Sequence, residues 1–231
     1  FMEIDIAANI NKIREKINAA AARCQRSPDS IKLLAVTKTV SPVIIDKAIA
    51  AGLTEFGENY VQEAKEKIAL IEHRVKWHMI GHLQTNKAKY VANLFDYIHS
   101  VDRIELAKEI DKRAGLTGRK INILIEINVS GEKSKNGIPP ANAIGLIRDI
   151  AQLENISVKG LMTMAPYSDN PENSRPFFSE LRKLQRKIVN EGITGVQMDE
   201  LSMGMTDDFE IAIEEGATIV RIGRAIFGER K

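Results

Sequence analysis

The chain has 231 residues, of which 44% are hydrophobic and 28% charged, and its formal net charge is +2. This length suits one α/β domain with a sizeable core, and no apolar run approaches the ~20 residues that a membrane-spanning helix needs. Because the charge is too small to argue for nucleic acid and the N-terminus lacks a secretory pattern, we expect a cytoplasmic protein that binds neither nucleic acid nor membrane.

Short β-rich segments alternate with helical segments along the chain. The first helix is predicted at Ile6 to Cys24, where apolar residues recur at helical spacing. Strands are predicted at Ile31 to Thr37, Thr54 to Phe56, Lys76 to Ile80, Tyr97 to Val101, Ile121 to Val129, Val158 to Met164, Val196 to Leu201 and Thr218 to Ile222. Helices are predicted between them at Val43 to Ala51, Asn59 to Glu72, Gln84 to Leu94, Arg103 to Ala114, Pro140 to Leu153, Pro176 to Glu191 and Asp208 to Glu215.

Eight such units predict a single domain over residues 1–231, folded as a closed (β/α)8 TIM barrel of the α/β class. After the last strand only Arg224 to Lys231 follow, so a conventional eighth helix is missing. We expect the extra N-terminal helix to cover that side of the barrel. Ligands of such barrels bind at the carboxyl ends of the strands, so polar residues there are candidates for function.

Two candidates follow the first two strands. Lys38 stands directly after the apolar segment Leu33 to Thr37. A lysine that apolar neighbours partly desolvate can attack an aldehyde and form a Schiff base, but a solvated loop lysine is the alternative. Asn59 follows Gly57 and either caps the next helix, which is the default interpretation, or donates its amide to a ligand. His78 and His82 straddle a strand end rather than share a helix face, so no metal site is predicted.

The last two strands end in segments that suit an anion. Ser202 and Thr206 place two hydroxyls before a helix whose amino end favours negative charge, although Asp207 there would also fit an ordinary helix cap. Gly223 and Arg224 form a turn whose backbone N–H groups can bind phosphate, unless the glycine serves packing alone. Barrels often bind phosphate between these two loops, so the sequence predicts a phosphate site there.

Together these segments closely resemble the pyridoxal-phosphate homeostasis proteins, the YggS/PROSC family. The resemblance runs from about residue 5 to residue 228 and rests on Ala35 to Lys38, Phe56 to Asn59, Trp77 to Gly81, Gly160 to Thr163, Leu201 to Phe209 and Val220 to Gly228. Two small departures are Thr206, where serine is commoner, and His82, where many bacterial members have proline. The resemblance implies a barrel like the N-terminal domain of alanine racemase.

The resemblance also implies the cofactor and its contacts. The cofactor is pyridoxal 5′-phosphate (PLP), which Lys38 holds as a Schiff base while Arg221 faces its pyridine nitrogen. Phosphate or other polar contacts are implied for Asn59, Ser202, Thr206, Gly223 and Arg224. An arginine beside that nitrogen disfavours its protonation, and an unprotonated ring is a poorer electron sink. Broad transaminase chemistry is therefore not expected.

A racemase of this barrel type tolerates such an arginine, but it uses a second base, typically a tyrosine from an additional β domain. Only Glu229 to Lys231 follow Gly228, so we expect no such domain. The leading hypothesis is a monomeric carrier with little or no catalysis that buffers PLP or delivers it to PLP-dependent apoenzymes. The alternatives are a single-domain amino-acid racemase and an isomerase of phosphorylated metabolites in which Lys38 is only a surface charge.

Overall fold

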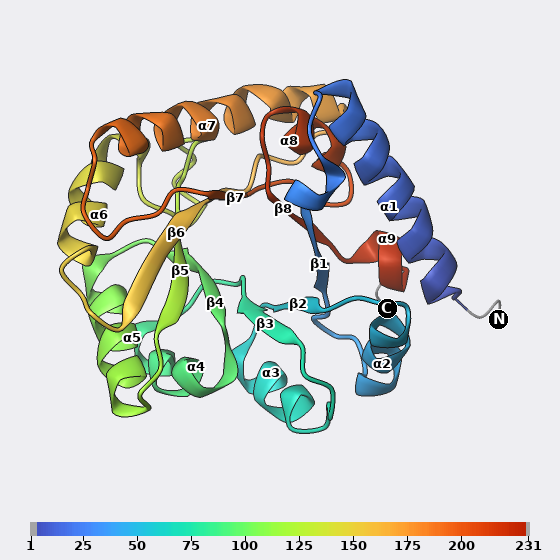
Figure 1. The fold of residues 1–231 in the computed structure, drawn as a ribbon, viewed down its shortest axis with the longest axis horizontal. Helices are drawn as coiled ribbons and strands as arrows, with labels where there is room; N and C mark the ends of the chain where they lie inside the picture. Colours follow the sequence, from blue (N-terminus) through green and yellow to red (C-terminus); the bar gives the residue numbers. More distant parts are fainter. Residues whose placement is uncertain (1–3, 230–231) are drawn as a thin grey trace.

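A computed structural model of the protein describes residues 4–229. Its strands form a closed barrel in which every strand runs parallel to its neighbours and β1 pairs with β8 (Figure 1). The strands are β1 (Lys32–Val36), β2 (Glu55–Glu58), β3 (Lys76–Met79), β4 (Tyr97–Val101), β5 (Ile121–Glu126), β6 (Ile156–Met162), β7 (Glu200–Ser202) and β8 (Ile219–Ile222). The predicted eight-stranded barrel is confirmed.

Helices surround the barrel and alternate with its strands. They are α1 (Ile6–Arg23), α2 (Pro42–Ala50), α3 (Val61–Ile68), α4 (Ala88–Leu94), α5 (Ile104–Leu116), α6 (Ala143–Ile150), α7 (Arg175–Asn190), α8 (Phe209–Glu214) and α9 (Arg224–Phe227). Short 3₁₀ turns occur at η1 (Pro28–Ser30), η2 (Thr85–Lys87), η3 (Pro140–Asn142) and η4 (Pro171–Ser174). Within residues 4–229, no helix combines the length and the apolar character that crossing a membrane requires.

The first helix covers the side of the barrel where the chain ends. α1 packs against α8, α9 and α2, and it runs along the outside of the ring in Figure 1. Its buried stripe includes Ile6, Ile10, Ile13 and Ile17, and the Asn9 side-chain amide donates to the carbonyl of Ile226 in α9 at 3.0 Å. Because α9 is only four residues long, α1 supplies apolar cover that a full eighth helix would otherwise provide, as expected.

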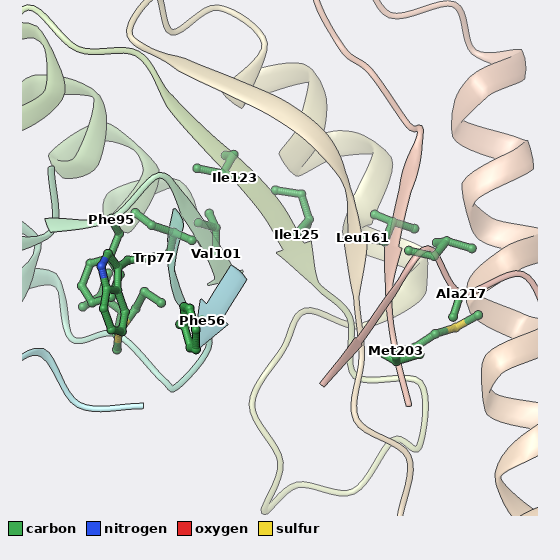
Figure 2. Close-up of a cluster of buried hydrophobic side chains, with 14 of the residues drawn as sticks. Phe56, Trp77, Phe95, Val101, Ile123, Ile125, Leu161, Met203 and Ala217 are labelled. Carbon is green, nitrogen blue, oxygen red and sulfur yellow. The ribbon is translucent and has the colours of Figure 1, made fainter. Parts of the chain in front are cut away.

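The main hydrophobic core lies between the strands and the surrounding helices. Figure 2 shows Phe56 and Trp77 gathered with Phe95 on one side of this layer, with the rings of Phe56 and Trp77 5.5 Å apart. A smaller apolar cluster formed by Leu34, Leu124, Met162 and Ile219 fills the middle of the barrel. The interior is therefore packed rather than open, and a ligand can only bind at an end of the barrel.

Two strands, β5 and β7, are each three residues shorter than predicted. The apolar segment from Val196 predicted a strand, but apart from a hydrogen bond from the Gln197 amide to the carbonyl of Val158, pairing with β6 begins at Glu200. The carbonyl of Met198, which lies between these points, accepts a hydrogen bond from the Gln185 side chain of α7 instead. β5 ends at Glu126, and the chain then folds back so that the amide of Ile138 donates to the carbonyl of Glu126 at 2.9 Å. The loop that follows β5 thus lies against the carboxyl end of its own strand.

Candidate functional site

A cavity of about 450 Å³ opens at the carboxyl ends of the strands. This volume lies in the range of sites that enclose small organic ligands. The cavity is lined by Val36, Lys38, Asn59, Ile80, Met164, Met205, Thr206, Asp207, Arg221, Gly223, Arg224 and Glu229. Six of the seven predicted site residues are among them, although they come from distant parts of the sequence. The seventh, Ser202, is fully buried and does not line the cavity.

Asn59 lines the cavity but does not cap α3, so the default interpretation of this residue is wrong. The N-cap of α3 is Tyr60, and no side chain caps that helix end. The Oδ1 atom of Asn59 is buried and has no hydrogen-bond partner among the described residues. Gly81 packs so closely that a Cβ there would lie 2.3 Å from the Asn59 carbonyl oxygen. A buried, unpartnered acceptor in a cavity wall fits a ligand that carries a donor.

Arg221 enters the cavity from β8 and is only 4% exposed. One terminal nitrogen of its guanidinium donates to Ser202 Oγ at 2.7 Å, and the other donates to the carbonyl of Thr163 at 2.9 Å. Burial lowers the pKa of Arg221 to about 10, so the group is positively charged near neutral pH. The Ser202 hydroxyl therefore holds Arg221 in place from inside the barrel.

A chain of buried side chains continues from Ser202 toward the amino end of the barrel. Ser202 Oγ lies 2.9 Å from His99 Nδ1, and His99 Nε2 lies 2.9 Å from His78 Nδ1. His78 Nε2 is in turn 2.7 Å from Glu55 Oε2. Both histidines are fully buried. This chain links the floor of the cavity to the opposite end of the barrel.

The carboxylate at the end of this chain sets the direction of its hydrogen bonds. Hydrogen bonding to His78 helps to hold the pKa of Glu55 below its ordinary value, so Glu55 accepts, and burial holds the pKa of His99 far below its ordinary value. Because Arg221 already donates to Ser202 Oγ, the Ser202 hydroxyl donates its own proton to His99, His99 donates through its other ring nitrogen to His78, and His78 donates to Glu55. The lone pairs of Ser202 are then free to accept from Arg221.

Replacing Ser202 by alanine tests this arrangement. In Ser202→Ala the buried guanidinium loses one acceptor and His99 loses its donor, so we expect a cost of roughly 1–3 kcal/mol in the free energy of unfolding. Ser100→Ala is the matched control, because Ser100 Oγ is also buried in a strand but has no partner among the described residues. Urea unfolding of both variants measures the effect, and an equal loss in the two would contradict the role assigned to Ser202.

The rim of the cavity carries paired charges. The Arg224 guanidinium donates to both carboxylate oxygens of Asp207, at 2.6 and 2.9 Å. Asp207 therefore does not cap α8; the N-cap residue is Asp208, whose Oδ1 accepts from the Met205 amide at 2.8 Å. These contacts hold the β7 and β8 loops together beside the cavity, where the sequence predicted an anion site.

The sequence indicated half of the residues that line the cavity, but not the residues that support them. His99 was not singled out, because a lone histidine in an apolar strand carries no spacing signal. The apolar contributions of Ile80, Met164 and Met205 to the cavity were also missed. The buried Tyr97 lies lower in the barrel, where its hydroxyl donates to Glu200 at 3.2 Å.

Comparison with known proteins identifies the family. The model of the alanine racemase N-terminal domain family matches residues 6–231. A pyridoxal phosphate homeostasis protein of Aquifex aeolicus is 47% identical over 96% of this chain and 97% of its own length, and one of Escherichia coli is 42% identical over 98% and 97%. The chain belongs to the pyridoxal phosphate homeostasis protein family. The resemblance found in the sequence is therefore confirmed.

Solved structures agree with this family assignment. PipY of Synechococcus elongatus, determined with PLP bound, is 35% identical, matches 94% of this chain and 100% of its own, and superposes with a TM-score of 0.81. An alanine racemase of Clostridium difficile superposes with a TM-score of 0.73 at 15% identity, and this chain matches 57% of it. The second similarity shows that this chain shares the barrel fold of the racemase.

Proposed function

We propose that this protein binds PLP in the cavity at the carboxyl ends of the strands and takes part in the cell's PLP homeostasis. The observation that carries the proposal is that one cavity is lined by both a lysine at a strand end and a buried arginine, Lys38 and Arg221. The names of the relatives and the PLP-bound PipY structure support the same ligand.

The residues of the cavity fit this cofactor. PLP supplies an aldehyde that condenses with a primary amine and releases water, and Lys38 is the amine we assign to it. Arg221 would face the ring nitrogen, and the unpartnered Asn59 Oδ1 would accept from a donor on the ligand. Thr206 and the backbone amides of Gly223 and Arg224 would hold the phosphate. Ser202 acts behind the cavity, through Arg221.

We further propose that the protein is a carrier that buffers or delivers PLP, with little or no catalysis. Arg221 is charged and held by two hydrogen bonds, so it would oppose protonation of a ring nitrogen placed against it. A racemase also needs a second base, and no tyrosine is among the residues that line the cavity within the described part of the chain. Both features favour holding the cofactor over using it.

Reduction by borohydride tests the binding proposal. Protein saturated with PLP is expected to absorb at roughly 420 nm, as amine-bound PLP does. Borohydride should convert this species into a stable pyridoxyl-lysine, which peptide mass spectrometry should locate on Lys38. If protein saturated with PLP shows neither this absorbance nor a reducible adduct, the binding proposal is wrong.

Proton exchange separates the carrier from the racemase. The PLP-loaded protein is incubated with several amino acids in deuterated water, and deuterium at the α-carbon is followed by NMR. We expect exchange far below ordinary enzymatic rates, which are on the order of 1 per second or more. Turnover at such a rate with any of these amino acids would overturn the carrier proposal.

We also propose that residues 1–231 form one domain, that the protein acts as a monomer in the cytoplasm, and that PLP-dependent apoenzymes receive its cofactor. The match of one family model to residues 6–231 supports the single domain. Sedimentation equilibrium with and without PLP tests the monomer, and a dimer in either state would contradict it.

A further inference from the structure

A buried lysine outside the cavity contacts the segment that carries Lys38. Lys67 lies on the inner face of α3 and is only 7% exposed. Its ammonium group donates to the carbonyl oxygen of Thr37 at 2.5 Å, and it forms ion pairs with Glu58 at 3.0 Å and Glu63 at 2.6 Å. One cation thus joins α3, the end of β2 and the end of β1.

The same two carboxylates bind the residues on either side of Lys38. Glu58 Oε1 accepts from the Thr37 hydroxyl at 2.6 Å. Glu63 Oε1 accepts from the backbone amide of Thr39. Both contacts reach Lys38 only through its neighbours in the chain, so they control where the backbone of Lys38 lies without touching the cavity.

The backbone at this point needs such control. Thr39 has a φ of +63°, in the left-handed region, which β-branched residues rarely adopt. The turn is closed by a hydrogen bond from the Val40 amide to the Thr37 carbonyl at 2.9 Å. A conformation of this kind costs free energy and persists only where the surroundings hold it. Here the surroundings are the carboxylates and the ammonium group of Lys67.

The charges of this cluster depend on one another. Glu58 is fully buried, and burial raises its pKa, which the Thr37 hydroxyl and the Lys67 ammonium group act to lower. Removing one member of a buried ion pair leaves the other uncompensated. Without Lys67, therefore, the bonds that Glu58 and Glu63 make to the residues flanking Lys38 also weaken.

We propose that Lys67 is a positioning residue for Lys38: with Glu58 and Glu63 it fixes the turn from Thr37 to Thr39 and so directs the Lys38 amine toward the aldehyde of the cofactor. The inference rests on the proposed function and extends it to residues outside the cavity. It concerns the bond to the aldehyde alone, because none of the three residues lines the cavity.

Two ligands that differ only at the aldehyde isolate this role. PLP can react with Lys38, whereas pyridoxine 5′-phosphate carries an alcohol in place of the aldehyde and cannot. For Lys67→Met we expect the Kd of PLP to rise on the order of tenfold or more, as misplaced reacting groups lose efficiency steeply, while the Kd of pyridoxine 5′-phosphate changes by less than about twofold. The matched control is Lys65→Met, on the exposed side of the same helix, which should change neither constant.

A second variant covers the case in which Lys67→Met does not fold. Glu63 is 26% exposed, so Glu63→Ala removes the acceptor of the Thr39 amide without emptying a core position. We expect the same selective loss for PLP in this variant. Equal changes for both ligands, or none, in the folded variants would overturn the role of Lys67. If the unmodified protein itself does not prefer PLP and shows no reducible adduct, the proposed function fails instead.

Discussion

Lys38→Ala is expected to lose the borohydride-reducible PLP adduct completely, because Lys38 is the only lysine among the described residues that line the cavity. The guanidinium groups of Arg221 and Arg224 also line it, but they are not amines and do not form such an adduct. The phosphate and ring contacts that we propose do not involve Lys38, so the variant should still bind pyridoxine 5′-phosphate. Only the part of the affinity that depends on the bond to the aldehyde should disappear.

The measurement combines visible absorbance, mass spectrometry after reduction, and calorimetric titration with both ligands. Lys133→Ala, which changes an exposed lysine in the loop after β5, is the control for nonspecific labelling and should behave like the unmodified protein. A stoichiometric pyridoxyl group in reduced Lys38→Ala, on whichever lysine, would show that the cavity is not organised around Lys38.

Glu126→Gln is expected to change how stability depends on pH. Glu126 is 3% exposed at the end of β5, and its Oε2 has no hydrogen-bond partner among the described residues. Burial, aided by the charge of Asp102, raises the pKa of Glu126 to about 7, against the opposing effect of Arg221. The folded protein therefore holds this proton more tightly than the unfolded chain does.

The sign of the effect follows from this difference. The contribution of Glu126 to stability is fully present below about pH 4.5, the ordinary value, and is lost as the pH rises through about 7. At roughly 1.4 kcal/mol per pKa unit, the loss amounts to about 3 kcal/mol. Glutamine carries no such proton. The free energy of unfolding of Glu126→Gln, relative to that of the unmodified protein, should therefore rise by up to about 3 kcal/mol between these pH values.

Urea unfolding of the cofactor-free protein at several pH values between about 4.5 and 8.5 measures this difference. Glu154→Gln, at an exposed position, is the control and should follow the unmodified protein at every pH. Parallel curves for Glu126→Gln and the unmodified protein would show that the Glu126 carboxylate ionises normally in the folded state.

Much of the fold could be predicted from the sequence because its signals are local. Apolar spacing predicted α1 from Ile6, and β-rich runs predicted all eight strands in order, with the bounds of β4 identical to those observed. Strand ends were predicted less well where tertiary contacts decide them. Nothing near Met198 indicates that its carbonyl accepts a hydrogen bond from a glutamine of α7, and β7 begins only after this residue.

The candidate site divides in the same way. Lys38, Gly223 and Arg224 could be proposed because each occupies a strand end, and the barrel topology brings strand ends together. The resemblance to a known family favoured a ligand contact for Asn59 and placed Arg221 beside the ring nitrogen. The position of Ser202 behind the cavity was not predictable, because the choice between a ligand contact and a contact to Arg221 depends on the depth of its side chain in the barrel.

The sequence by itself determined the order of elements, the closed barrel, the family and half of the residues that line the cavity, since all of these follow from periodicity, spacing and motifs. Only the tertiary structure decided what supports these residues. The chain from Ser202 to Glu55 and the contacts of Lys67 join strands and helices far apart in sequence. Such contacts depend on distances of about 3 Å between side chains, and no local pattern in a single sequence encodes those distances.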